Sequence, residues 1–320
     1  MAADLLCMGE PMLEFNQQPA LPDGRRLYLE GHGGDTSNAA IAASRQGVSA
    51  GYITAIGQDS AGDSFLRLWA AEGVDSSTVA RSAERPTAIY FVTHGPRGHE
   101  FLFYRTGSAA SAYGPEDVPE EAIAQAQILY LSGISQGISP RAADACFRAI
   151  EVARAHGVRV AYDTNYRPRL WPPARASAVI HAAIARADIA LPGLDDVGAL
   201  LGMTEPQAIL DHYLLLGPKI VVLKMGATGA WLALPESRRF IPPHPCLPVD
   251  STGAGDTFCG SFLARLILGD APEAAARYAA VAAALSTIGY GAVAPIPRAA
   301  DVLTELSRDA AASPAAGGGS

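Results

Sequence analysis

Small residues run directly into an acid at positions 251–256 (STGAGD), just before an apolar pattern of helical period. At such a helix start the backbone N–H groups of Gly253, Ala254 and Gly255 lack acceptors within the helix, and the positive end of the helix dipole lies behind them. Glycine also omits the β-carbon that would hold an anion away from the amides. The segment therefore predicts a cradle for a phosphate-like oxyanion.

Asp256 follows this cradle directly and needs an explanation, because its carboxylate would repel a bound phosphate. Phosphoryl transfer to an alcohol requires fixed dipoles that stabilise the moving phosphoryl group and a base that accepts the hydroxyl proton. We therefore predict that Asp256 is the general base of a kinase. The alternative is that Asp256 merely occupies the first turn of a helix, where acidic side chains are favourable in any case.

Other catalytic patterns are missing from the sequence. It contains no Gly-x-x-x-x-Gly-Lys-Ser/Thr loop and no His-Glu-x-x-His pair, and no Gly-x-Gly-x-x-Gly opens a helix after the first expected strand. The four cysteines lie far apart and form no Cys-x-x-Cys pair. A Walker-type nucleotide site, a zinc centre and a dinucleotide-binding dehydrogenase are accordingly disfavoured.

The elements that must position these residues predict an α/β fold. From about residue 129 onward, short β-branched or apolar runs alternate with alanine-rich stretches of helical period, which is typical of a mostly parallel sheet flanked by helices. The expected strands are 128–131, 158–162, 189–191, 220–224 and 231–234, and the expected helices are 142–155, 174–185, 255–268, 272–288 and 299–307.

The first hundred residues show a different pattern. Segments 5–9 and 51–56 predict core strands with a helix at 36–46 between them, whereas 26–30 and 88–104 alternate side chains with period two. Such alternation is typical of a small sheet with one face open to water, which needs a second surface to pack against. We expect this sheet to form a lid over a site or to pair with a second subunit. The Ala, Gly, Ser and Pro residues of 309–320 predict a disordered tail.

Composition narrows the class of partner. The 320 residues carry a net charge of -8 and 49% hydrophobic side chains, with no stripe of Lys and Arg, so nucleic acid is an unfavourable partner. The N-terminus lacks the features of a signal peptide, and the weakly polar stretch 278–294 predicts a buried helix rather than a membrane span. We expect reduced thiols and a cytoplasmic location.

Residues 250–256 (DSTGAGD) resemble the second signature of the PfkB, or ribokinase-like, carbohydrate kinases, which reads Asp-Thr-x-Gly-Ala-Gly-Asp. The likeness extends from about Leu5 to about Pro297. It implies a ribokinase-like sheet with a small β-sheet lid, ATP as phosphoryl donor and Mg²⁺ as its metal. It also assigns the base to Asp256 and the anion hole to the Gly253, Ala254 and Gly255 amides.

Two further segments are similar to parts of these kinases. Residues 33–40 (GGDTSNAA) resemble the first signature, which implies that Gly33 and Gly34 approach the sugar closely and that Asn38 helps to hold it. The segment KMGATG is similar to the strand turn beside the nucleotide, which implies nucleotide contacts from Lys224, Gly226 and Gly229. Taken alone, that glycine pair is more often only a hairpin turn.

One departure from the family concerns magnesium. The family has Asn-x-x-Glu where this chain has Gly193-Leu194-Asp195-Asp196, so Asp196 stands for the acid while the asparagine is missing. The metal ligands therefore stay open.

Within the family, three stretches resemble the 2-keto-3-deoxygluconate (2-dehydro-3-deoxygluconate) kinases: FYR and GSAAS within 103–111, DTNYRPRLW at 163–171 and LPGLDD at 191–196. A sugar acid needs a forked cationic donor, for which Arg105 and Arg167 are the candidates. Tyr90 and Tyr104 could cover the sugar from the lid. The resemblance also implies nucleotide contacts from Asn165 and Arg167. Each lone Tyr or Arg could instead be sheet packing or solvated surface.

The sequence thus predicts a single kinase domain at 1–308, with a lid formed by 10–34 and 86–108. The predicted reaction is transfer of the γ-phosphoryl group of Mg-ATP to the C6 hydroxyl of 2-keto-3-deoxygluconate. A neutral-sugar kinase for fructose or ribose is the alternative within this reaction class, and a catalytically silent sugar- or nucleotide-binding protein is the alternative outside it. Family resemblance implies a homodimer through the lid or a larger homo-oligomer.

Overall fold

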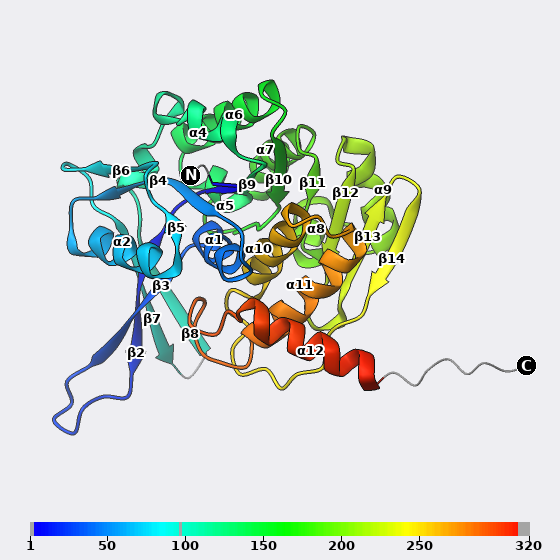
Figure 1. Cartoon of the computed structure of the whole chain (residues 1–320). Coiled ribbons are helices and arrows are strands. Elements are labelled where there is room, and N and C mark those ends of the chain that lie inside the picture. Colours follow the sequence, from blue (N-terminus) through cyan, green and yellow to red (C-terminus); the bar gives the residue numbers. More distant parts are fainter. Residues whose placement is uncertain (1–2, 96–97, 313–320) are drawn as a thin grey trace, which may run out of the picture.

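A mostly parallel sheet forms the centre of the molecule (Figure 1). The computed structural model describes residues 3–95 and 98–312. The strand order of the sheet is β14-β13-β12-β11-β10-β9-β1-β4-β5, with β6 also paired to β4. Among these described strands, the β12–β13 and β13–β14 pairs are antiparallel and the other pairs are parallel. The strands are β1 (Leu5–Met8), β4 (Ala50–Gly57), β5 (Val74–Asp75), β6 (Val79–Ser82), β9 (Ile128–Ser132), β10 (Arg159–Asp163), β11 (Ile189–Ala190), β12 (Ile220–Lys224), β13 (Ala230–Leu234) and β14 (Ser237–Ile241).

Helices cover both faces of this sheet, which confirms the predicted fold class. Because the strands are buried on both sides, they read as continuous apolar runs. One face packs against α1 (Asp35–Arg45), α2 (Ser60–Glu72), α10 (Ala254–Ile267) and α11 (Pro272–Ser286). The other packs against α4 (Glu120–Gln125), α6 (Pro140–Ala155), α7 (Pro173–Ile184), α8 (Leu194–Leu201) and α9 (Pro206–Leu216). The remaining helices are α3 (Ala109–Ala112), η1 (Pro115–Asp117), α5 (Gly133–Gly137), η2 (Gly226–Thr228) and α12 (Ala299–Ala312), the last packed on α11.

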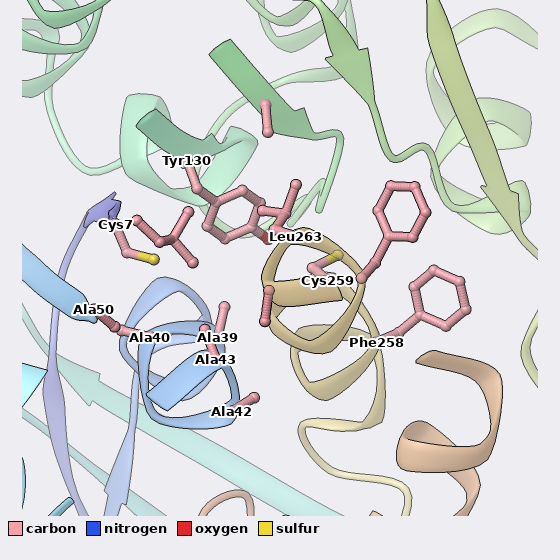
Figure 2. Packing of buried hydrophobic residues seen from close by; sticks show 14 of the residues in the cluster. Cys7, Ala39, Ala40, Ala42, Ala43, Ala50, Tyr130, Phe258, Cys259 and Leu263 are labelled. Carbon is pink, nitrogen blue, oxygen red and sulfur yellow. The ribbon is translucent and has the colours of Figure 1, made fainter. Parts of the chain in front are cut away.

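Helices α1 and α10 lie unusually close together because their facing residues are small. A β-carbon on Gly260 of α10 would lie 2.2 Å from the carbonyl oxygen of Ala39 of α1. Figure 2 shows the alanines of α1 packed beside Cys259 and Leu263 of α10. This close packing brings the first turns of the two helices to one place.

A second, four-stranded sheet has the order β3-β2-β7-β8, which confirms the small sheet predicted for the lid. Its strands are β2 (Met12–Gln18), β3 (Leu27–Gly33), β7 (Ala88–Gly95) and β8 (Gly98–Tyr104). Strands β2 and β7 pair in parallel, and the two outer pairs are antiparallel. The alternating segment 88–104 is therefore a hairpin, and residues 96–97 at its tip lie outside the described residues.

The sequence pattern does not predict α2, although its end signals are present. The Asp59 side chain accepts a hydrogen bond from the Gly62 amide, and Gly73, with φ 70°, ends the helix in the left-handed conformation. Phe65 and Trp69 are its buried residues of largest volume, so α2 contributes substantially to the core.

The C-terminal boundary differs from the prediction. Residues 309–312, expected in a disordered tail, form the last turn of α12. The Asp309 carboxylate accepts a hydrogen bond from Arg277 at 2.8 Å, and the alanines that follow have the highest helix propensity. The rest of the predicted tail, 313–320, lies outside the described residues.

Candidate active site

The predicted residues Lys224 and Asp256 gather with Asp35 and Asp163, which were not predicted, at the carboxyl end of the parallel strands. Asp163 and Lys224 end β10 and β12, while Asp35 and Asp256 stand in the first turns of α1 and α10. Ligands of open α/β sheets bind at this edge, because loops and helix N-termini converge there. The site is thus assembled from segments more than two hundred residues apart in sequence.

The anion cradle begins at Gly253, which has φ 77° and precedes α10 without a side-chain cap. In the part of the chain that the structure describes, the N–H groups of Gly253 and Gly255 have no hydrogen-bond acceptor. The N–H group of Ala254, in contrast, donates to the Ser251 carbonyl at 3.2 Å. The cradle therefore presents two of the three predicted amides, and the contribution expected from the Ala254 amide is not available in this conformation.

Asp256 lies at the edge of this cradle and is half-buried. Its Oδ2 atom accepts a hydrogen bond from Asn38 Nδ2 at 2.8 Å. Burial, and next the nearby charge of Asp35, raise the pKa of Asp256 to about 7. A carboxylate with this pKa holds a proton more strongly than an ordinary aspartate and is still ionised in part at neutral pH, as a general base requires.

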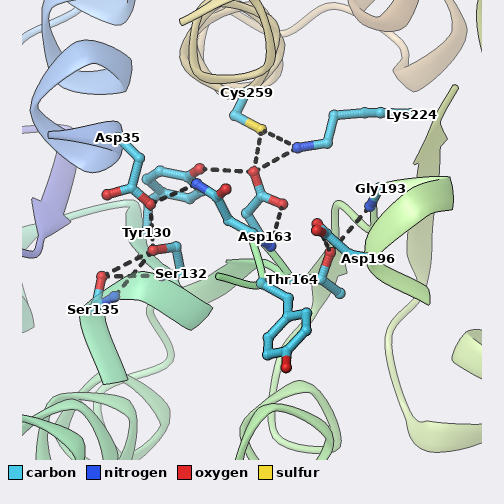
Figure 3. A network of polar contacts seen from close by, with 12 residues as sticks. Asp35, Tyr130, Ser132, Ser135, Asp163, Thr164, Gly193, Asp196, Lys224 and Cys259 are labelled. Carbon is cyan, nitrogen blue, oxygen red and sulfur yellow. Dashed lines mark hydrogen bonds and ion pairs between the residues drawn. The ribbon is translucent and has the colours of Figure 1, made fainter. Parts of the chain in front are cut away.

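Asp35, a site residue that sequence reasoning did not single out, is buried beside Asp256. Its Oδ2 atom accepts hydrogen bonds from Ser132 Oγ at 2.5 Å and from Asn165 Nδ2 at 2.8 Å (Figure 3). Burial raises the pKa of Asp35. Asn165 was expected at the nucleotide, but its amide group is engaged with Asp35, because a φ of 26° turns the chain back after β10.

Lys224 forms a buried ion pair that the sequence did not predict. Its Nζ atom lies 2.5 Å from Asp163 Oδ2 and 3.3 Å from Cys259 Sγ (Figure 3). A β-carbon on Gly255 would lie 3.9 Å from the same nitrogen, so the ammonium group is adjacent to the cradle. Burial acts to lower the pKa of Lys224, but the Asp163 carboxylate outweighs it and raises that pKa. The sequence did contain one indication that Asp163 belongs to the site, because it is an acidic residue at the carboxyl end of an apolar strand.

A cavity of about 430 Å³ adjoins Lys224 and the cradle. This volume is within the range of small-molecule sites. The lining includes Lys224, Gly226, Gly229 and Gly255, which were predicted at the nucleotide, together with Ala283 and Thr287 near the end of α11. A β-carbon on Gly229 would lie 2.4 Å from the Ile241 carbonyl oxygen, so this turn requires glycine.

Asp196 does not line this cavity and stands in the first turn of α8. Its Oδ2 atom accepts a hydrogen bond from Thr164 Oγ1 at 2.9 Å. Burial, followed by the charge of Asp163, raises the pKa of Asp196. Asp196 is therefore close to the Asp163–Lys224 pair and electrostatically linked to it.

The paired glycines allow a close contact between the lid and the core. A β-carbon on Gly33 would lie 2.6 Å from the Tyr90 hydroxyl, and one on Gly34, where φ is 122°, would lie 2.7 Å from the Glu10 carbonyl oxygen. Tyr90 is buried, and its hydroxyl donates a hydrogen bond to the Glu14 carboxylate. Tyr90 thus lies on the lid face that adjoins the glycine pair.

Tyr104 points away from Tyr90, which corrects the prediction that both rings cover one sugar. In the hairpin register Tyr90 stands opposite Phe103, whereas Tyr104 stands opposite Ile89. Successive side chains of a strand project to opposite faces, so Phe103 shares the face of Tyr90 and Tyr104 does not. Tyr104 is 57% exposed and contacts the edge of Phe91.

The two predicted arginines differ in their partners. Arg105 forms an ion pair with the buried carboxylate of Glu10, which also accepts a hydrogen bond from Ser108 at 3.0 Å. Arg167 is exposed, and its NH1 group donates a hydrogen bond to the Tyr166 carbonyl at 3.0 Å. Among the described residues no carboxylate pairs with Arg167, so its guanidinium is available to an anionic ligand.

A raised-pKa aspartate, an anion cradle and a lysine beside a nucleotide-sized cavity together define the class of enzymes that transfer a phosphoryl group to a hydroxyl. Comparison with known proteins agrees. Residues 22–299 match the family described as pfkB family carbohydrate kinase. The chain is 33% identical over 307 residues to the 2-dehydro-3-deoxygluconokinase of Thermoproteus tenax, covering 93% of each chain. It is 31% identical over 309 residues to the protein of that name from Escherichia coli, covering 92% of this chain and 98% of that one.

Solved structures show the same similarity. A putative ribokinase II from Escherichia coli, in complex with ATP and Mg²⁺, superposes with a TM-score of 0.88 at 25% identity, covering 96% of this chain and 99% of that chain. The chain belongs to the pfkB family and is a carbohydrate kinase. Over residues 3–95 and 98–312, no helix is both long enough and apolar enough to cross a membrane.

Proposed function

We propose that this kinase transfers the γ-phosphoryl group of ATP to the C6 hydroxyl of 2-dehydro-3-deoxygluconate. The observation that carries the proposal is the position of Asp256, whose carboxylate adjoins the free Gly253 and Gly255 amides and is linked through Asn38 to the start of α1. The cavity beside Lys224 supports ATP as the donor, since its lining of small residues suits a flat base.

Asp256 accepts the proton of the sugar hydroxyl while the hydroxyl oxygen forms a bond to the γ-phosphorus. The bond between that phosphorus and the oxygen of the leaving ADP then breaks. The amides of Gly253 and Gly255 stabilise negative charge on the transferring group, because they are preorganised and need no reorientation. The Lys224 ammonium group, next to Gly255, adds a positive charge at the same place.

The Asp196 carboxylate fits a magnesium ion bound together with nucleotide phosphates. Mg²⁺ takes oxygen ligands and is held by one or two carboxylates plus phosphate oxygens and waters. Asp196 supplies such an oxygen near the cradle, whereas both oxygens of Asp163 already accept hydrogen bonds within the protein. When bound, the ion would neutralise charge on the phosphate oxygens.

Arg167 supports a sugar acid as acceptor. It has no carboxylate partner among the described residues, whereas the guanidinium of Arg105 is already paired with Glu10. A guanidinium group matches the two oxygens of a carboxylate better than a lysine does. The relatives from Thermoproteus tenax and Escherichia coli carry the name of the same activity.

A substrate panel tests the proposal. ADP release is measured with saturating Mg-ATP and 2-dehydro-3-deoxygluconate, its galactonate epimer, fructose or ribose. We expect the highest kcat/KM for 2-dehydro-3-deoxygluconate, with phosphate on C6 by NMR. A higher kcat/KM for fructose or ribose would instead assign a neutral-sugar kinase, and no ADP release with any sugar would contradict the kinase proposal.

We also propose a homodimer that forms through the lid. The lid exposes Leu27, Leu29, Phe101 and Leu102, and a small sheet with apolar residues on its surface gains stability by packing against another surface. A cytoplasmic location is consistent with the four unpaired cysteines of the described chain.

A further inference from the structure

The Asp163–Lys224 pair lies beside the cavity and the cradle, yet Asp163 has no part in the reaction described above. Asp163 is buried, and Lys224 reaches it across the end of β11, since β11 separates β10 from β12 in the sheet. The side chains of Asp163 and Lys224 are only 2% and 16% exposed, so the pair is costly to form, because both charges lose most of their hydration. Such a pair persists where its geometry is well satisfied or where it serves a function.

The Asp163 carboxylate is fixed from several sides. Its Oδ1 atom accepts the backbone N–H of Asn165 at 3.2 Å, and its Oδ2 atom accepts hydrogen bonds from Cys259 Sγ at 3.3 Å and Tyr130 at 3.5 Å, besides that of Lys224 (Figure 3). These partners come from β9, the β10 loop and α10. Asp163 is therefore a rigid anchor for the lysine.

The ammonium group of Lys224 keeps one donor for a ligand. It has three N–H donors, of which Asp163 Oδ2 takes one and Cys259 Sγ accepts a second, weaker hydrogen bond. Within the described residues the third has no partner, and Gly255 of the cradle is the neighbouring residue. The contacts with Asp163 and Cys259 thus set the direction of the third N–H group.

We propose that Asp163 is a positioning residue for phosphoryl transfer, which together with Cys259 holds the Lys224 ammonium group against the Gly255 end of the cradle, where the phosphate chain of the nucleotide binds. This inference deepens the proposed function and rests on it. The lysine side chain is long and flexible, so without Asp163 its ammonium group would be free to leave the cradle.

The central test compares Asp163→Asn, which keeps shape and removes charge, with Asp188→Asn as a matched control. Asp188 precedes β11 at the opposite end of the same sheet and accepts the Val160 N–H at 2.8 Å. We expect Asp163→Asn to weaken ATP binding, measured by calorimetry without sugar, at least tenfold and to lower kcat/KM at least a hundredfold. Asp188→Asn should change neither by more than twofold. Values for Asp163→Asn within twofold of wild type would overturn the proposal.

A double-mutant cycle shows whether Asp163 acts through Lys224. The cycle compares Asp163→Asn in the wild-type and the Lys224→Met backgrounds. If Asp163 only positions the lysine, its replacement changes ATP affinity less than twofold once the ammonium group is gone. An equal loss in both backgrounds would show that Asp163 acts independently, which overturns the inference.

A pH profile adds a readout that a purely structural residue would not change. The charged and titratable groups around Lys224 are Asp163 from β10, Asp196 from α8, and Cys259 and Asp256 from α10. In Asp163→Asn the main opposing charge is gone and burial dominates, so the pKa of Lys224 falls. We expect ATP affinity to decline with rising pH in the variant over a range where wild type is constant. Parallel profiles for the two proteins would count against the proposal.

Cys259 provides a second variant if Asp163→Asn does not fold, as thermal unfolding would show. Cys259→Ala removes the second anchor of Lys224, whereas Cys259→Ser keeps a hydrogen-bonding group of similar size. We expect Cys259→Ala to raise the Kd for ATP at least threefold and the serine to restore it. Equal affinities for the two would overturn the role given to the anchor. Because ATP binding is measured without sugar, an error in the proposed sugar would leave these results interpretable.

Discussion

At the scale of single residues, the site depends on the contrast between two neighbouring acids. Asp35 accepts two hydrogen bonds through Oδ2, from Ser132 and Asn165, while Asp256 has one amide partner and faces the cradle. Burial, and next the charge of Asp35, raise the pKa of Asp256, so the environment rather than the residue type distinguishes Asp256 as the proposed base.

Replacing Asp256 with asparagine tests its role as base. We expect Asp256→Asn to lower kcat by at least a thousandfold, since the hydroxyl proton has no acceptor, and to change the Kd for the sugar less than threefold. The measurements are ADP release and calorimetric sugar binding. A variant with near-normal kcat would contradict the assignment.

The pKa of Asp256 also predicts a pH dependence. Below pH 7 the carboxyl group is increasingly protonated and cannot accept the hydroxyl proton, so kcat/KM should fall about tenfold per pH unit and level off above 7. Asp35→Asn removes the charge of Asp35 and should move this limb to lower pH. An unchanged limb in that variant would mean that Asp35 does not act on Asp256.

Because Arg167 is exposed, its replacement tests whether the enzyme recognises the carboxylate of its substrate. Arg167→Ala should raise KM for 2-dehydro-3-deoxygluconate at least tenfold and KM for a neutral sugar less than twofold, because only the acid loses a charge-assisted pair. Arg175→Ala, an exposed arginine at the start of α7, is the control. Equal losses for both sugars would argue against carboxylate recognition.

At the scale of elements, the start of α10 depends on the backbone of Gly253. Gly253→Ala places an L residue at φ 77°, which costs about 1 kcal/mol, and brings its β-carbon to 3.0 Å from the Ala292 carbonyl oxygen. Gly269→Ala incurs the same backbone cost at φ 94° with no atom within 4 Å. We expect similar losses in free energy of unfolding by urea denaturation, but a large loss of kcat/KM only in Gly253→Ala.

Strand alternation decides which lid tyrosine matters. The sequence showed that the segment was alternating, but the hairpin register, in which Tyr90 stands opposite Phe103, determined that Phe103 shares the face of Tyr90. Tyr90→Phe should raise KM for the sugar severalfold, because the Glu14 contact is lost. Tyr104→Phe should leave KM unchanged, and an effect as large as that of Tyr90→Phe would contradict this arrangement.

At the scale of the whole molecule, the sequence predicted most core strands and helices, because their periodicity is local, but it did not predict α2, α8 and α9. It also located Asp256 and the glycine cradle, since a helix start and a signature motif lie in one short segment. It could not locate the Asp163–Lys224–Cys259 contacts, which join strands β10 and β12 to helix α10 across about a hundred residues. Such contacts follow from how the layers pack, and no local pattern encodes that packing.

The exposed apolar residues of the lid predict that the protein forms a dimer in solution. Leu29 of β3 is 62% exposed and lies on the lid face that carries Tyr90. In the register of the sheet, Leu29 stands opposite Asn16 of β2, and Asn16 stands opposite Val92 of β7. Val92 is two residues from Tyr90 and therefore projects to the same face. If two lids pack together, Leu29→Asp buries a charge in the interface and should convert a dimer to a monomer in light scattering. Leu215→Asp, at an 88% exposed position on α9, should leave the dimer intact. A wild-type monomer at micromolar concentration, or a dimer unaffected by Leu29→Asp, would exclude assembly through this face.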